Sequence, residues 1–142
     1  VLDQISKLAI LAHFTPYRDE YIVAPFFSLV HWLNTGAAFS LFANQPGWQR
    51  GFFIVVAFVA SGVMLFLLRR PHYSPLFHPA LALILGGALG NVVDRIAYGH
   101  VVDFLLFHWR DWFYPAFNLA DSAITLGAAL LVFDSFRKSP KP

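Results

Sequence analysis

The sequence predicts an all-α membrane protein, a bundle of four transmembrane helices of which the first is present only in part. Hydrophobic residues make up 58% of the 142 residues and charged residues only 13%, about half of the ~25% usual in soluble domains. Residues 51–68 carry no charge and are long enough to cross the hydrocarbon core of a bilayer as a helix. The length suits a single domain, residues 1–142.

The chain begins with VLDQISKLAILAHF, which we expect to be the end of an apolar helix. A complete span would need roughly 15–20 further residues before it, at ~1.5 Å per residue. Asp3 and Lys7 are four positions apart and therefore share one face of this helix. They can form an ion pair at a helix end or support a nearby site, and both interpretations stay open.

Two regions before the second span are predicted to lie outside the hydrocarbon. Residues 15–26 contain two prolines and three adjacent charges. Residues 26–42 are rich in aromatic residues and contain an Asn-Thr-Gly turn signal, so we expect short strands on the membrane surface. Residues 44–51 are predicted to form a loop in which Trp48 anchors the chain at the interface.

Three complete spans are expected after this loop. The first, residues 51–68, ends at Arg69, Arg70 and Pro71. The next covers residues 79–98 and the last covers residues 116–136. Residues 99–115 connect them and are dense in aromatic side chains, as expected where a chain meets lipid headgroups.

The basic residues predict an orientation. Arg69 and Arg70 follow one span, and three basic residues follow the last span, so these ends and the C-terminus are expected in the cytoplasm. The candidate polar residues then fall at one depth, toward the outer side of the membrane. They are Asp3, Asn34, Asn91, Asp94, Arg95, Asp103, Asn118 and Asp121. This convergence indicates a functional site.

Composition limits the chemistry of such a site. The chain has no Cys, which excludes a disulfide, a thiol nucleophile and a Cys/His zinc site. The six His do not form an H-E-x-x-H motif; His100 and His108, on either side of Asp103, are a weaker alternative for metal binding. The net charge of +2 without an aromatic basic stripe gives no support for nucleic-acid binding. We expect neither a metal nor a cofactor.

Two carboxylates remain for hydrolysis, Asp103 shortly after the third span and Asp121 near the start of the last. In a poorly hydrated pocket such a pair does not ionise fully, so one carboxyl keeps a proton while the other activates water. Two structural alternatives stay open. Asp103 can be a surface residue of a wet loop, and Asp121 can form a buried ion pair with Arg95.

The neighbouring polar residues suit supporting roles. Asn118 precedes Asp121 by three positions and can orient it, while Asn91 and Arg95 share a face of the third span. Arg95 can neutralise the site or hold a lipid headgroup, and Asp94 is expected to support Arg95 or cap the structure. The nearby glycines Gly86, Gly87 and Gly90 are expected to permit close helix packing.

The chain resembles the lipoprotein signal peptidase (signal peptidase II) family of bacterial aspartyl peptidases. The resemblance is carried by DQISK at 3–7, NTGAAFS at 34–40, GGALGNVVDR at 86–95, VVDF at 101–104 and FNLAD at 117–121, in family order. It implies a four-helix inner-membrane protein with a small extracytoplasmic β-cradle. It also implies cleavage before a diacylglyceryl-modified Cys and inhibition by globomycin.

The resemblance places the family's catalytic dyad on Asp103 and Asp121. Its supporting and substrate-binding residues fall on Asp3, Lys7, Asn34, Gly36, Asn91, Asp94, Arg95 and Asn118. The implied partners are lipidated prolipoprotein signal peptides and membrane lipids.

Two other classes of protein are alternatives. A small transporter subunit would relay protons or ions through Asp94, Arg95 and Asp121, yet the inner halves of the last three spans hold no acidic residue before Asp134. A structural membrane scaffold would leave the outer polar cluster without a role. Both are less well supported than a peptidase.

Overall fold

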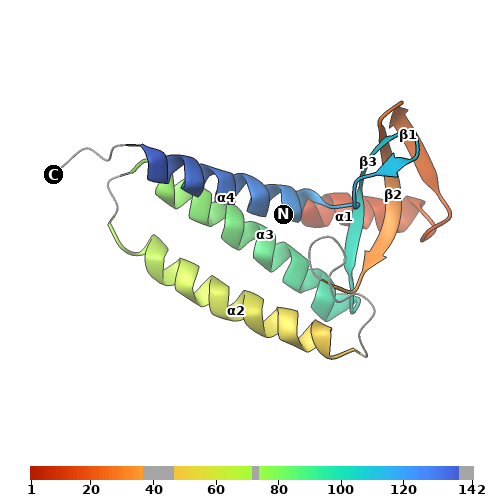
Figure 1. The fold of residues 1–142 in the computed structure, drawn as a ribbon. Helices are drawn as coiled ribbons and strands as arrows, with labels where there is room; N and C mark the ends of the chain where they lie inside the picture. The colour runs from red at the N-terminus through yellow and green to blue at the C-terminus, as the bar shows by residue number, and fades with distance from the viewer. Residues whose placement is uncertain (37–46, 72–73, 138–142) are drawn as a thin grey trace.

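The computed structural model describes residues 1–36, 47–71 and 74–137. Three helices are long and apolar enough to cross a membrane: α2 (Trp48–Leu68), α3 (Phe77–Ala97) and α4 (Leu119–Phe136). A shorter helix, α1 (Leu2–His13), precedes them. Figure 1 shows the three long helices running alongside one another, with a small sheet across one end. The three complete predicted spans are therefore confirmed as helices, with ends shifted by a few residues.

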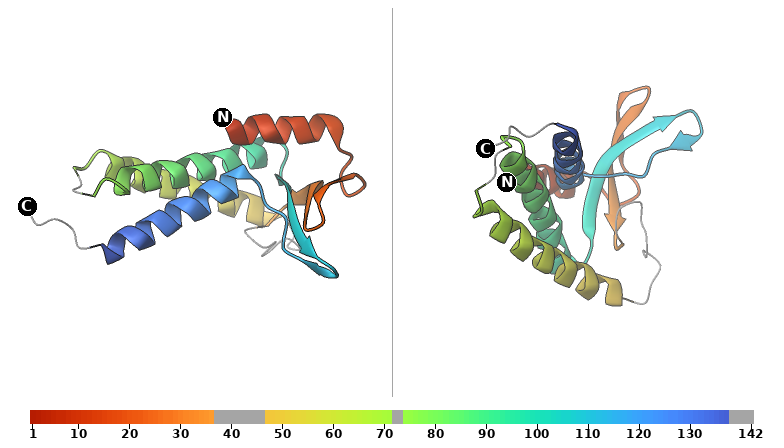
Figure 2. Two further views of the ribbon diagram at one scale, coloured as in Figure 1. Left: turned by 90° about the horizontal axis from the view of Figure 1, so that it is seen from above. Right: turned by 60° about the vertical axis from the view of Figure 1, so that its left-hand side comes forward.

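The sheet is antiparallel and has the order β1-β2-β3-β4. Its strands are β1 (Glu20–Ala24), β2 (Phe27–Asn34), β3 (Val101–Trp109) and β4 (Trp112–Phe113). The long β2–β3 pair lies at the sheet end of the helices in both views of Figure 2. In its register Trp32 faces Asp103 and Asn34 faces Val101. The pairing of these strands therefore brings two predicted site residues, Asn34 and Asp103, close together.

Part of the sheet corrects the expectations from sequence. Residues 99–115 were expected to be a simple connection, but they contain β3 and β4 because VVDFLLFHW is rich in β-branched and aromatic residues. β1 lies within the segment expected only to be polar and external. The strand expected after residue 26 is β2, while residues 37–42 of that prediction lie outside the described residues. Trp48 belongs to the first turn of α2 rather than to a loop.

Small residues bring α3 and α4 into close contact. A Cβ added at Gly87 would lie 2.4 Å from the Ala120 carbonyl oxygen, and one at Gly127 would lie 2.6 Å from the Ala80 carbonyl oxygen. Gly90 is also tightly packed, against the Asp3 carboxylate. The packing role is confirmed for Gly87 and Gly90. It is wrong for Gly86, where an added Cβ would meet no atom within 4 Å and which instead lines a cavity beside α4.

The helix α1 packs at the sheet end of the bundle. Ile10 forms a buried apolar cluster with Val102 and Phe104 of β3, so one face of α1 is fixed against the sheet. Figure 1 shows α1 beside the start of α4, and the ends of α2 and α4 at the opposite end of the molecule. This arrangement puts the polar side chains of α1, the end of α3 and the start of α4 into one region.

Candidate active site

Asp103 is buried on β3 and accepts two side-chain hydrogen bonds. It is only 3% exposed. Asn34 Nδ2 donates to Asp103 Oδ2 across 3.0 Å, and Asn118 Nδ2 donates to Oδ1 across 2.7 Å. The β2–β3 register explains the first bond, because Asn34 is the diagonal neighbour of Asp103 on the same face of the sheet. The wet-loop interpretation of Asp103 is therefore wrong.

Asp121 lies in the first turn of α4, where it forms a capping box with Asn118. The Asn118 side chain accepts the Asp121 backbone N–H at 2.9 Å, and the Asp121 carboxylate accepts the Asn118 N–H at 3.4 Å. Such reciprocal bonds satisfy backbone donors at a helix start. Asp121 Oδ1 also accepts a bond of 2.8 Å from Asn91 Nδ2. Asn118 consequently contacts both carboxylates.

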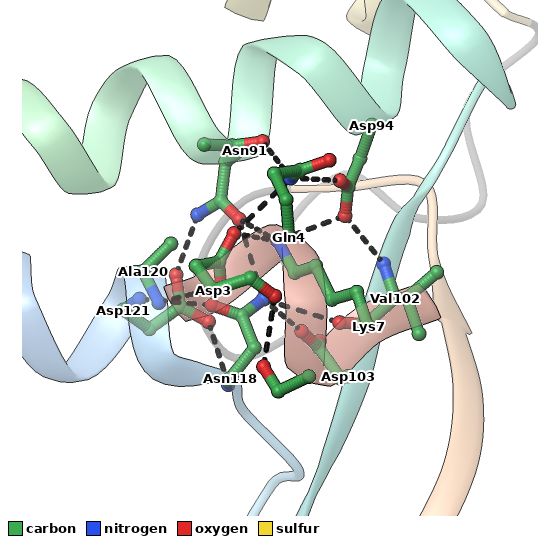
Figure 3. Close-up of polar contacts among 12 residues, drawn as sticks. Asp3, Gln4, Lys7, Asn91, Asp94, Val102, Asp103, Asn118, Ala120 and Asp121 are labelled. Carbon is green, nitrogen blue, oxygen red and sulfur yellow. Dashed lines mark hydrogen bonds and ion pairs between the residues drawn. The ribbon is translucent and has the colours of Figure 1, made fainter. Parts of the chain in front are cut away.

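Lys7 is the centre of a buried charge cluster behind the two carboxylates. It is 1% exposed and forms ion pairs of 2.9 Å with Asp3 and 2.8 Å with Asp94. Its ammonium also donates to Asn91 Oδ1 at 3.0 Å. Figure 3 shows these side chains converging from α1 and α3, beside Asn118 and Asp121 at the start of α4. The predicted Asp3–Lys7 ion pair is present, and Lys7 forms a second ion pair with Asp94, which is far away in the sequence.

Asp94 therefore has a different partner from the one expected. Its carboxylate contacts Lys7 and accepts hydrogen bonds from Gln4 Nε2 at 2.8 Å and the Val102 N–H at 3.1 Å. It is completely buried. Asp94 thus ties α3 to α1 and to the start of β3, and its carboxylate is bonded to these groups rather than to Arg95.

Asn91 joins the charge cluster to the carboxylate pair. Its Oδ1 accepts from Lys7 and, at 3.3 Å, from Asn118, while its Nδ2 donates to Asp121. One amide group on α3 thus contacts three side chains, one from α1 and two from the start of α4. The orientation of the amide follows from these partners, since only its nitrogen can donate to a carboxylate.

Arg95 approaches the site from the other side. One terminal nitrogen donates to the Gly36 carbonyl at 2.7 Å and the other to the Asn91 carbonyl at 3.3 Å. The guanidinium lies over the Phe53 ring, 5.2 Å from its centre. Between described residues, the ion pairs are those that Lys7 makes with Asp3 and Asp94, so the structural Asp121–Arg95 pair is not observed. Gly36 also donates its N–H to Asn34 Oδ1 at 2.9 Å.

Burial controls the ionisation of Asp103. Loss of solvent, together with the nearby Asp121 carboxylate, raises the pKa of this carboxyl to about 7. The hydrogen bonds from Asn34 and Asn118, and the charge of Lys7, act in the opposite direction. Asp103 can therefore hold or release a proton near neutral pH, as a group in acid–base catalysis must.

The two carboxylates open onto different cavities. Asp103 lines one of about 330 Å³ together with Tyr17 and Asn34. Asp121 lines an apolar cavity of about 470 Å³ along α4 and a second of about 340 Å³ between α2, α3 and α4. Asn34 lines all three. Asp103 and Asp121 thus lie where the apolar cavities along the helices approach the cavity beside the sheet.

Metal binding by His100 and His108 is disfavoured by their positions. They lie at opposite ends of β3, about 26 Å apart at ~3.3 Å per residue, and His108 bonds to the Ser28 hydroxyl at 2.9 Å. In the part of the chain that the structure describes, no group of three His, Asp or Glu side chains is placed to hold a metal ion.

Some residues of the site were not predicted. Gln4 donates to Asp94 and, at 3.1 Å, to the Gly90 carbonyl; its spacing from Lys7, three positions along a helix, was the available signal. The Ala120 N–H donates to Asp3 Oδ1 at 2.9 Å. This backbone contact fixes α1 against the first turn of α4, and no side-chain pattern indicates it.

Comparison with known proteins places this arrangement in context. Residues 1–137 match the family model described as Signal peptidase (SPase) II. The lipoprotein signal peptidase of Burkholderia ambifaria strain AMMD is 54% identical over 138 residues, which cover 97% of this chain and 82% of the relative. That of Tolumonas auensis is 50% identical over 142 residues, covering 99% and 86%.

Two solved structures have the same fold. Both are described as bacterial membrane enzymes studied by the in meso method. The first, at 2.3 Å resolution, has a TM-score of 0.83 and 29% identity, covering 99% of this chain and 87% of the other. The second, at 1.9 Å resolution, has a TM-score of 0.84 and 27% identity, covering 96% and 86%.

Proposed function

This chain belongs to the signal peptidase II family, as its motifs indicated, and we propose that it removes the signal peptides of lipid-modified bacterial prolipoproteins. The family is one of peptidases. The three membrane-capable helices fit a substrate whose signal peptide lies in the bilayer. The polar cluster at the sheet end of these helices is where we place the reaction.

We assign the chemistry to Asp103 and Asp121, as an aspartyl dyad. The observation that carries this assignment is the contact of Asn118 with both carboxylates, by its side-chain amide to Asp103 and by its backbone N–H to Asp121. A pair of carboxyl groups fixed in this way, with little solvent, shares one proton between them. The pair titrates as a unit, so neither member is given a separate role as acid or base.

The reaction follows from that shared proton. The ionised member takes a proton from a water molecule, whose oxygen bonds to the scissile carbonyl carbon, while the protonated member donates to the carbonyl oxygen. The tetrahedral intermediate then collapses and the C–N bond breaks, while one hydroxyl group of the intermediate returns its proton to the dyad. The leaving amine of the lipidated Cys receives a proton from the dyad, and the signal peptide leaves with a new carboxyl group.

The surrounding residues hold the dyad in place. Asn34, Asn91 and Asn118 supply the hydrogen bonds that aim the carboxylates. Lys7 compensates the charges of Asp3 and Asp94, and these in turn anchor α1 to α3 and α4. Arg95 and Gly36 form a second wall of the site, bonded to each other.

The cavities suit a substrate with long apolar parts. The space along α4 is lined by apolar side chains beside Asp121, and the space between α2, α3 and α4 leads from Asp121 and Arg95 into the bundle. We assign to Arg95 the binding of the glyceryl-linked headgroup region of the lipidated precursor. Unlipidated precursor should therefore be a poor substrate. Equal cleavage of lipidated and unlipidated precursors would contradict this role. A globomycin-type cyclic peptide would occupy the same region.

The membrane arrangement belongs to the same proposal. The four helices form the bundle of one domain in the bacterial inner membrane, with the sheet as a cradle on the extracytoplasmic side. The ends of α2 and α4, where Arg69, Arg70 and Arg137 lie, then face the cytoplasm together with the C-terminus.

Cleavage of a lipidated precursor by purified variants tests the assignment. Asp103→Asn and Asp121→Asn should each lower the rate by at least about a hundredfold, the size expected for loss of general acid–base catalysis. Asp111→Asn is the matched control, since Asp111 is an exposed carboxylate at the turn between β3 and β4. Near-normal turnover by either dyad variant in a folded state would overturn the proposal.

A further inference from the structure

The edge of β2 nearest the site is completed by a side chain rather than by a strand. β1 pairs with β2 only as far as Val30, although β2 continues to Asn34. Past that point the backbone groups of His31 and Leu33 face the side that β1 occupied, since alternate residues of a strand point their backbone groups to the same edge. These groups need partners from elsewhere in the chain.

Tyr17 supplies those partners. Its backbone N–H donates to the His31 carbonyl at 3.0 Å. Its hydroxyl donates to the Leu33 carbonyl at 2.9 Å and accepts the Leu33 N–H at 3.1 Å. Tyr17 thus makes the hydrogen bonds to His31 and Leu33 that a neighbouring strand would otherwise make. A hydroxyl can do this because it is both donor and acceptor.

The turn that presents Tyr17 is held in an uncommon backbone conformation. Tyr17 has φ of 57°, in the left-handed region that bulky residues rarely adopt. The turn is closed by bonds from the Arg18 N–H to the Thr15 carbonyl and from the Thr15 N–H to the Asp19 carboxylate. The ring is 62% exposed, so burial of apolar surface does not account for its position. Its hydrogen bonds to β2 do.

The residue after Leu33 is Asn34, which donates to Asp103. Tyr17 and Asp103 also line the same cavity. From this geometry we propose that Tyr17 is a positioning residue of the catalytic site, which fixes the end of β2 through Leu33 so that Asn34 is aimed at Asp103. The inference rests on the peptidase function proposed above, since it describes how the dyad of that function is held.

Removal of the hydroxyl in Tyr17→Phe tests this role. We expect kcat to fall about fivefold to tenfold with KM little changed, the effect of roughly one lost hydrogen bond on the reacting geometry. Tyr21→Phe is the matched control, because Tyr21 is equally exposed, at 63%, on the neighbouring strand and its hydroxyl bonds to no described residue. Equal kinetics of the two variants would contradict the proposal.

The titration of Asp103 separates positioning from a merely structural role. The bond from Asn34 lowers the pKa of Asp103, so a misplaced Asn34 should let that pKa rise above about 7. The charged groups that face Asp103 are Asp121 from α4, Lys7 from α1 and Arg95 from α3, and none of them is bonded to Tyr17. An upward shift in Tyr17→Phe, followed by carboxyl ¹³C NMR in micelles, would therefore report on Asn34. An unchanged titration would overturn the proposal.

Two further variants complete the experiment. In an Asn34→Ala background the additional Tyr17→Phe change should have no further effect on kcat or on the Asp103 titration, since Tyr17 acts through Asn34; additive effects would overturn the proposal. Tyr17→Asn removes the ring but tolerates the left-handed backbone, so it should reproduce the same shift even if Tyr17→Phe folds poorly. The NMR readout does not depend on catalysis. A shift in Tyr17→Phe together with full activity of Asp103→Asn would support the positioning and refute the proposed dyad.

Discussion

Asn118 donates from its side-chain amide to the Asp103 carboxylate across 2.7 Å, and the same residue is the N-cap of α4. The Asn118 side chain, which is completely buried, therefore both caps α4 and holds the Asp103 carboxylate. The cap fixes Asp121 in the first turn of α4, so Asn118 links the position of Asp121 to that of Asp103. This coupling of local helix chemistry to site geometry leads to the first prediction.

Asn118→Ser and Asn118→Ala should separate capping from positioning. Serine can still cap the helix but is too short to reach Asp103, whereas alanine can do neither. We expect both variants to lose at least about tenfold in cleavage rate, and the alanine variant to be less stable than the serine variant by about 1 kcal/mol. Thermal unfolding in micelles and cleavage assays measure the two effects. Wild-type activity in Asn118→Ser would show that the bond to Asp103 is dispensable.

The pH dependence of cleavage is the second prediction. Burial raises the pKa of Asp103 to about 7, and the Asp121 carboxylate contributes, so the shared proton is lost as pH rises through this value. The rate should therefore fall about tenfold per pH unit above ~7. Asn34→Ala removes a bond that lowers this pKa, so the falling limb should move to higher pH. A limb that stays in place would mean that the limb reports another group.

The raised pKa of Asp103 also makes the stability of the folded state depend on pH. A carboxyl whose pKa is raised in the folded state binds its proton more tightly there than in the unfolded chain. Its favourable contribution is complete below about 4, the ordinary pKa of Asp, and is lost as pH rises toward 7. Asp103→Asn removes this dependence, so its stability relative to wild type should increase between pH 4 and 7. A constant difference across this range would contradict the assignment of the raised pKa.

Helix packing beside the site gives the fourth prediction, with the adjacent glycine as its control. Gly87→Ala would push a methyl group against the Ala120 carbonyl, next to Asp121, whereas Gly86→Ala meets open space. We expect Gly87→Ala to destabilise the bundle and to lower activity. Gly86→Ala should be neutral or more stable by up to ~1 kcal/mol, since alanine favours helix over glycine. Equal effects of the two substitutions would show that α3 and α4 do not pack as described.

The sequence predicted the helices and the participants of the site better than their connections. Asp103 and Asp121 could be found because carboxylates are costly near hydrocarbon and the topology put them at one depth. β3 was missed because its aromatic residues are equally typical of a membrane interface. The capping box of Asn118 and Asp121 had a recognisable spacing. The Lys7–Asp94 pair has no such recognisable spacing in the sequence. Contacts between helices that are distant in the chain depend on how each helix is rotated about its axis.

That distant pair supports the last prediction. Lys7→Met should leave the buried Asp94 and the partly buried Asp3 without a counter-charge and should destabilise the protein by about 3–5 kcal/mol. A second change, Asp94→Asn, removes one of the uncompensated charges and keeps the oxygen that accepts the Val102 N–H. The double variant should therefore unfold at a higher temperature than Lys7→Met alone. If the second change lowered the unfolding temperature further, Lys7 would act on the fold through its apolar stem rather than through its charge.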